Sequence, residues 1–189
     1  MKRRDESQLD AWRLAALCEW QDQYWGMAKN MYQEDGVVEP VALLFGPEGM
    51  TSVPRDKASP GDWRNAITRG LRRSHAKMLL LIGEGFGIEP DKADEAIRRA
   101  EEMKAEGVFS LDKIPGAVSL LSVSMETAWG EGRRVYATTT SFGGQLSKSV
   151  DSGVYDVDSR EGKEADLLQS FFPPCRRPPL PDVPESDLN

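Results

Sequence analysis

Hydrophobic and polar positions follow the same succession twice along this chain: an amphipathic helical stripe, then two apolar runs joined by a glycine turn. In residues 9–54 apolar side chains recur every three or four positions, and two apolar runs then flank residues 47–49. In residues 62–142 a similar stripe is followed by runs on either side of residues 130–132. This pattern predicts an α+β fold in which helices cover one face of an antiparallel sheet of four or five strands.

The expected element order is α-β-β-α-α-β-β, followed by a short strand and a short helix. Helices are expected at residues 7–34, 61–82, 91–106 and 163–171, and strands at 37–45, 50–54, 117–127, 133–142 and 152–157. The apolar stripe of the third helix is narrow, so residues 89–115 are expected to form a helical insertion docked at the edge of the domain. Pro40 lacks an amide donor, so the first strand should begin irregularly there or lie at a sheet edge.

The segment from Met78 to Gly87 allows two interpretations. The apolar stripe that begins at Trp63 continues into it at helical spacing, which predicts the end of a helix followed by a glycine linker. The alternative is a buried strand running into a phosphate-binding glycine turn. Its last glycine is spaced wrongly for the dinucleotide-binding fingerprint and no lysine follows, so the helix is preferred.

Composition indicates one domain with a tail. The chain has 189 residues, 39% of them apolar and five of them tryptophan, with a net charge of −7. We expect a single α+β domain over residues 1–172 and a proline-rich, acidic tail over 173–189. No membrane span and no export signal are recognised, and Cys18 and Cys175 belong to no paired motif. A cytoplasmic protein with two free thiols is therefore expected.

Few residues suggest catalysis, so the catalytic residues stay unknown. Glu126 ends an apolar strand, where a desolvated carboxylate could do acid/base chemistry, and Asp151 is a candidate second carboxylate. A solvent-facing glutamate at the strand end is the simpler expectation. His75 is the single histidine, and a partly buried or flanking position on its helix explains it without a catalytic role. No metal site and no cofactor are expected.

One charge feature rises above the background. Residues 55–77 contain seven basic and two acidic residues, a net charge of +5 in a chain whose total is −7. Arg69, Arg73 and Lys77 follow at four-residue spacing, with Arg72 beside them, and so should form one ridge of the second helix. Such a ridge could bind phosphates or an acidic protein surface. The alternative is an arginine-rich solvated face balanced by the neighbouring acidic helix.

The tail contains Arg177-Pro178-Pro179-Leu180-Pro181, which has the form of a polyproline ligand for an aromatic groove. A linker, or an arm that packs on its own domain, is the simpler interpretation. Trp20, Tyr24 and Trp25 wrap more than one side of the first helix, which leaves enough apolar surface for a homodimer.

The acidic-glycine, proline and apolar-strand segment Glu34–Phe45, together with the strand end Met125-Glu126-Thr127-Ala128-Trp129, resembles a loose group of small uncharacterised phage and metagenomic α+β proteins. The resemblance covers residues 30–142, and the insertion departs from the pattern. It implies no activity, but it implies a mobile-element protein, and small acidic proteins of that kind often bind a host protein.

Three functions are therefore expected in order of preference. The first is a non-enzymatic cytosolic interaction protein with a protein partner, such as a phage-encoded inhibitor of a host protein or defence system. The second is a small-molecule-binding or carboxylate-based enzyme domain that uses Glu126 and Asp151. The third is binding of an anionic ligand or nucleic acid through Arg69, Arg72, Arg73 and Lys77, which the lack of interleaved stacking aromatics makes less favoured.

Overall fold

The computed structural model describes residues 6–55, 60–88, 90–107, 113–139 and 145–157. Its helical segments are η1 (Glu6–Gln8), α1 (Ala11–Ala15), the π-helical η2 (Ala16–Trp20), α2 (Gln21–Asp35), α3 (Pro60–Arg73), η3 (Pro90–Lys92) and α4 (Ala93–Ala105). Its strands are β1 (Val41–Gly46), β2 (Gly49–Pro54), β3 (Met78–Ile88), β4 (Ala117–Thr127), β5 (Glu131–Thr138), β6 (Val150–Asp151) and β7 (Tyr155–Asp156). The helix expected at 163–171 and the tail at 173–189 lie outside the described residues.

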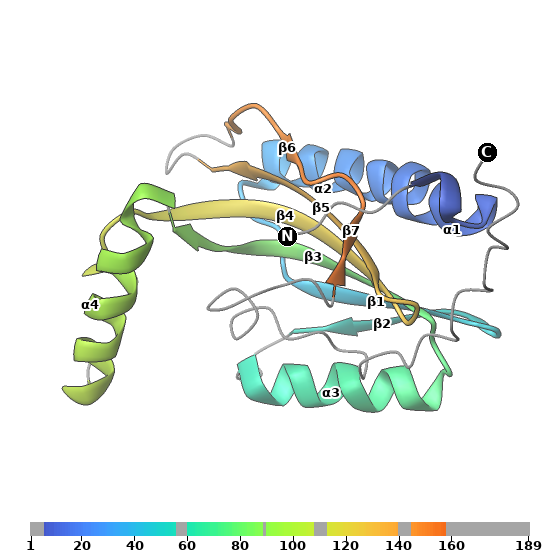
Figure 1. The fold of residues 1–189 in the computed structure, drawn as a ribbon, viewed down its shortest axis with the longest axis horizontal. Coiled ribbons are helices and arrows are strands. Elements are labelled where there is room, and N and C mark those ends of the chain that lie inside the picture. The colour runs from blue at the N-terminus through green and yellow to red at the C-terminus, as the bar shows by residue number, and fades with distance from the viewer. Residues whose placement is uncertain (1–5, 56–59, 89, 108–112, 140–144, 158–189) are drawn as a thin grey trace, which may run out of the picture.

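The strands form one antiparallel sheet in the order β2-β1-β3-β4-β5-β6, and β7 pairs with the beginning of β5 (Figure 1). The α+β class is confirmed, but the sheet has seven strands among the described residues alone, rather than four or five. Strand β1 begins directly after Pro40 and lies between β2 and β3, so the edge is β2 and not the proline-containing segment. Within the expected strand at 152–157 only Tyr155–Asp156 forms a strand, β7, and the short strand β6 lies just before that range.

The first helix packs on one face of the sheet. Segments α1, η2 and α2 follow one another without a break, and α2 ends at Gly36, whose φ of 72° is the left-handed conformation that glycine adopts easily. The buried side of α2 contacts a core formed by alternate residues of β1, β3, β4 and β5. Trp25, Ala28 and Tyr32 supply most of the helix side of this core.

The helix α3 covers the opposite face of the sheet, over β1 and β2 (Figure 1). Ile67 and Leu71 pack there against Leu44 and Leu79, which are fully buried. The expectation that helices cover a single face was therefore wrong. Strands β1 and β3 carry apolar residues at nearly every position, and such strands need a cover on both sides.

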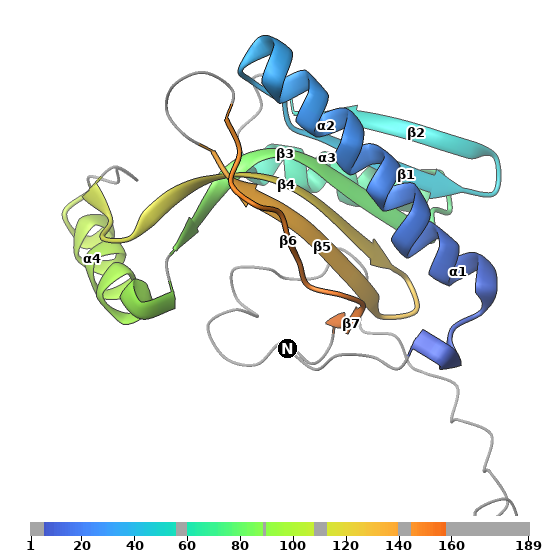
Figure 2. The same ribbon diagram turned by 90° about the horizontal axis from the view of Figure 1, so that it is seen from above.

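The charged helix α4 lies beyond one end of the sheet, between β3 and β4 in the chain (Figure 2). Ala96 and Met103 bury its narrow apolar stripe in a small cluster with Ile114. The predicted helix at 91–106 is confirmed, whereas the interpretation of residues 89–115 as an insertion stays a prediction. The run at 117–127 also forms the expected central strand, since β4 pairs with β3 on one side and β5 on the other.

The segment Met78–Ile88 corrects the sequence interpretation. It is the strand β3 and not the end of a helix, because α3 ends at Arg73 and the chain turns through His75, which has a φ of 48°. Leu79 and Leu80 point to opposite faces and both are fully buried. A glycine fits within the strand at Gly83, where an added Cβ would lie 2.7 Å from the Cα of Pro40.

Candidate functional site

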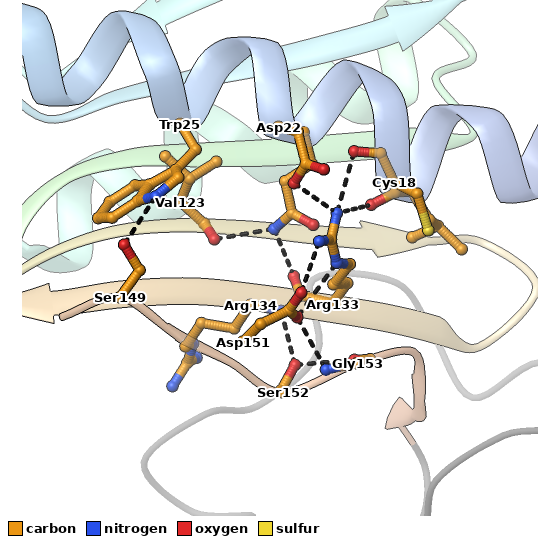
Figure 3. A network of polar contacts seen from close by, with 12 residues as sticks. Cys18, Asp22, Trp25, Val123, Arg133, Arg134, Ser149, Asp151, Ser152 and Gly153 are labelled. Atoms are coloured by element: carbon orange, nitrogen blue, oxygen red, sulfur yellow. Dashed lines mark hydrogen bonds and ion pairs between the residues drawn. The ribbon is translucent and has the colours of Figure 1, made fainter.

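The side of α2 that faces β5 and β6 holds a polar cluster built around Arg133 (Figure 3). Arg133 follows the β4–β5 turn, and strand alternation places it on the same face as Val135 and Ala137, below the helix. Its guanidinium donates to Asp151 through Nη2 at 2.6 Å and Nε at 3.2 Å, and pairs with Asp22 at 2.9 Å. A planar guanidinium suits such two-point contact with a carboxylate.

The π-helical segment η2 supplies the remaining partners of Arg133. Nη1 donates to the backbone carbonyls of Leu17 and Cys18, at 3.0 Å each. Hydrogen bonds in a π-helix span five residues, and a π-bulge of this kind redirects carbonyls away from the regular helical pattern. The bulge thus lets one arginine join the helix to the sheet.

Gln21 makes a second link at the start of α2. Its side-chain amide donates to the carbonyls of Val123 and Arg133, both at 2.8 Å, and the residue is fully buried. Its carbonyl oxygen Oε1 is buried without a hydrogen-bond partner among the described residues. The amide therefore joins α2 to β4 and β5 although one of its polar atoms stays unsatisfied.

Burial and charge shift two titrations in this cluster. Burial lowers the pKa of Arg133, but the hydrogen bond and charge of Asp151 and the charge of Asp22 outweigh it, so that the net pKa is raised. Burial raises the pKa of the Cys18 thiol, although the neighbouring Arg133 charge opposes the shift. At neutral pH the cluster therefore holds a charged guanidinium beside a protonated thiol.

The structure does not bring the two candidate carboxylates together. Asp151 binds Arg133 on the α2 face, whereas Glu126 pairs in register with Leu79 and Gly132 and points to the opposite face, with Leu79. Glu126 is also 7% exposed, so the expectation of a solvent-facing glutamate was wrong. Among the described residues, no group of three or more histidine, cysteine, aspartate or glutamate side chains could hold a metal ion.

The other side of α2, which faces the β1–β2 hairpin, is apolar and exposed. Trp20 and Tyr24 lie over Phe45, with ring centroids 6.0 and 6.3 Å apart, and the Tyr24 hydroxyl approaches the Met50 sulfur at 3.4 Å. The large apolar residues on this flank are strongly exposed: Trp20 41%, Met27 57%, Met31 45% and Met50 54%. We call these four residues the apolar flank.

The edge strand β2 carries Met50 of the apolar flank and lies on the outer side of β1 (Figure 2). The amide of Arg55 donates to the carbonyl of Pro40 at 2.9 Å, which fixes the hydrogen-bonded pairs of the hairpin at every second residue. By this alternation the backbone groups of Met50 and Ser52 point away from β1. No described strand lies on that edge.

An aromatic pocket of about 520 Å³ continues the apolar flank at the hairpin end of the sheet. Trp12, Trp20, Phe45 and Trp129 line it, and His75 and Lys77 stand at its exposed rim. Trp12 meets Trp129 edge to face with centroids 5.2 Å apart. The pocket is thus an aromatic surface bordered by one lysine and one histidine.

The predicted basic ridge is shorter than expected. Arg69, Arg72 and Arg73 are exposed on α3, but Lys77 lies after the helix and its carbonyl accepts a hydrogen bond from Ala128. His75, expected on that helix, occupies the turn and is exposed. These two residues border the aromatic pocket instead of extending the ridge.

Sequence reasoning missed Arg133 and the aromatic pocket. The signal for Arg133 was present, because Val135 and Ala137 were already assigned to one face of the strand and alternation places Arg133 there too. The pocket gave no local signal, since its lining comes from five separate segments.

None of the described helices is long and apolar enough to cross a lipid bilayer. Comparisons with protein-family models, with curated proteins and with solved structures find no match to this chain.

Proposed function

We propose that this protein is a non-enzymatic interaction protein that binds an extended segment of a partner protein between α2 and β2. The observation that carries this proposal is the apolar flank beside an edge strand. Soluble domains seldom expose large apolar side chains next to one another unless the surface binds something. The unpaired backbone groups of an open strand edge can form hydrogen bonds with an extended segment of another protein.

The two features complement each other in a strand-addition mode. The outward backbone groups of Met50 and Ser52 would pair with the partner's backbone, which gives affinity without sequence preference. Every second partner side chain would then meet Met27, Met31 or Trp20 on the apolar flank. Selectivity for apolar residues at alternate positions is the expected result.

The alternative functions have less support. A carboxylate-based enzyme would need Glu126 and Asp151 in one cleft, and they lie on opposite faces of the sheet. Binding of nucleic acid or another anion through Arg69, Arg72 and Arg73 remains a third candidate, with a ridge one residue shorter than expected. The phage origin, the role as a host inhibitor and the cytoplasmic location stay predictions, as does a homodimer.

The test is capture of partner proteins from host lysate by the tagged full chain and by a flank variant, Met27→Lys with Met50→Lys. The matched control is Phe86→Lys with Val150→Lys, which replaces two comparably exposed apolar residues, at 57% and 46%, outside the apolar flank. We expect a partner captured by the unaltered chain and the control but lost with the flank variant. Loss with both variants, or with neither, would contradict the proposal.

Once the partner is identified, amide hydrogen exchange of the complex tests the binding mode. Strand addition predicts slower exchange at Met50 and Ser52, whose amides point outward in the free protein. Protection confined to α3 or α4 would place the partner elsewhere.

A further inference from the structure

We propose that the aromatic pocket is occupied by the chain's own segment Pro178-Pro179-Leu180-Pro181, followed by Asp182 at the basic rim. The inference rests on the proposed function, because Trp20 and Met50 belong both to the pocket and to the apolar flank. The tail would then be an intramolecular competitor of the partner.

The chemistry of the pocket suits a proline-rich occupant. Its walls are the rings of Trp12, Trp20, Phe45 and Trp129, and proline-rich segments in the polyproline II conformation dock in grooves lined by aromatic residues. Prolines have no amide donor, so their backbone needs few hydrogen bonds from the site. They also lose little conformational freedom on binding, which favours a segment of this composition over an ordinary peptide.

The position where the described chain ends supports the same occupant. The amide of Val157 donates to the carbonyl of Gly130 at 2.8 Å, and Gly130 directly follows Trp129 of the pocket wall. Twenty residues lie between Val157 and Pro178. At about 3.3 Å per residue they can span roughly 70 Å, far more than the distance back to the neighbouring pocket requires.

Charge complementarity sets the direction of the segment. His75 and Lys77 form an exposed rim, and Arg72 and Arg73 lie close behind them in the chain. The prolines are followed by Asp182, Glu185 and Asp187. An acidic stretch placed along this rim would gain favourable interactions that salt weakens.

The tether makes the contact effective even if it is intrinsically weak. A covalently linked segment acts at an effective concentration in the millimolar range, so a partner must displace it before it can use the shared residues. The tail would therefore raise the partner's apparent dissociation constant, and a tail that cannot enter the pocket would lower it.

The experiment uses the five tryptophan indole N–H signals of the full chain in proton–nitrogen NMR spectra. The variant is Pro178→Ser with Pro179→Ser and Leu180→Ser, and the control is Pro173→Ser with Pro174→Ser. We expect the variant, but not the control, to move the signals of Trp12, Trp20 and Trp129. Trp25 and Trp63 should stay in place, because they donate to Ser149 and Val53 away from the pocket.

A synthetic peptide of residues 173–189 with Cys175→Ser, added to the variant, should return the three signals toward their original positions in a saturable way. Unchanged pocket signals, or equal changes at all five tryptophans, would overturn the proposal. Shifts that depend on protein concentration would also overturn it, since they would assign the segment to a second copy. These results are independent of the lysate capture. The proposal that the tail occupies the pocket can therefore be overturned while the proposal of partner binding between α2 and β2 is supported.

Discussion

The two sides of α2 differ in both chemistry and exposure. Toward β5 and β6, Arg133 and Gln21 join the helical segments η2 and α2 to the sheet through four hydrogen bonds and the ion pair with Asp22, and both side chains are buried. Toward β2, Met27 and Met31 extend into solvent and the adjacent strand edge carries no described neighbour. The polar side thus stabilises the packing of the helix on the sheet, and the apolar side stays exposed.

The central face of α2, with Trp25, Ala28 and Tyr32, is apolar and buried as in any amphipathic helix, but its two flanks depart from that arrangement, since the polar flank is enclosed and the apolar flank is exposed. Burial of Arg133 requires several carbonyls and carboxylates in fixed positions, so the polar side tolerates little change. Exposed methionines contribute little to the free energy of unfolding, so nothing in the fold itself accounts for them. The difference indicates that stability depends on one side and binding on the other.

The largest expected effect comes from removing the central arginine. Arg133→Met keeps an aliphatic side chain under the helix but removes the donor to the carbonyls of Leu17 and Cys18 and the charged partner of Asp151, which keeps only its other contacts, such as the Gly153 amide. Loss of a buried charged partner predicts a decrease of about 3 kcal/mol in the free energy of unfolding, measured by urea denaturation.

The control for this change is Arg134→Met, the next residue along β5. Arg134 points to the opposite face of the sheet, where its Nε donates to the Ser124 hydroxyl at 2.8 Å. Arg134→Met should therefore decrease the free energy of unfolding by about 1 kcal/mol. Equal losses for the two variants would show that the cluster around Arg133 contributes no special stability.

The same contrast shows how far sequence reasoning reached. The helix on which both sides lie, the hairpin β1–β2 and the strand β4 could be predicted, because each has a local period that sets its conformation. The contacts of Arg133 with Leu17 and Cys18 bridge more than one hundred positions of the chain, and no local pattern specifies them. The face of the sheet on which Arg133 lies could be predicted from the sequence, whereas its hydrogen-bond partners could not.

The misassigned strand β3 has a related cause. Leu79, Leu80 and Leu81 form a continuous apolar run, so neither a period of two nor a period of 3.6 separates strand from helix there. Only the tertiary structure, with covers on both faces, decides between them. The turn at His75 could not be predicted from the sequence, because a positive φ is uncommon for any residue other than glycine, although histidine adopts it more often than most.

A smaller loss is expected from Gln21→Leu. The leucine removes two hydrogen bonds to the carbonyls of Val123 and Arg133, but it also removes the buried, unsatisfied Oε1 atom. The two effects oppose each other, and a net decrease of about 1 kcal/mol in the free energy of unfolding is expected. The exposed Gln23→Leu serves as the control and should change the urea midpoint little. A stabilised Gln21→Leu variant would mean that the unsatisfied oxygen dominates.

Substitutions on the apolar flank should hardly change stability. Met27→Lys and Met31→Lys place a charge on exposed positions, so each should alter the free energy of unfolding by less than about 0.5 kcal/mol. Ala28→Lys, one residue along the helix but buried at 1% exposure, should by contrast prevent stable folding. Thermal unfolding monitored by circular dichroism separates these outcomes. A large loss for Met27→Lys would mean that this side also supports the fold.

The smallest expected effect is a pH dependence carried by Cys18 on the polar side. Burial raises the pKa of this thiol in the folded chain, with the Arg133 charge opposing, so the folded state retains the proton more strongly than the unfolded state. The resulting stabilisation is complete below the unfolded pKa of about 8.5 and is lost as the pH rises through the folded value. Urea midpoints of the unaltered chain should therefore fall slightly more between pH 7 and pH 10 than those of Cys18→Ala. An equal fall in both would show that the thiol beside Arg133 is as hydrated as a thiol in the unfolded chain, and that the polar side of α2 is less closed than its hydrogen bonds indicate.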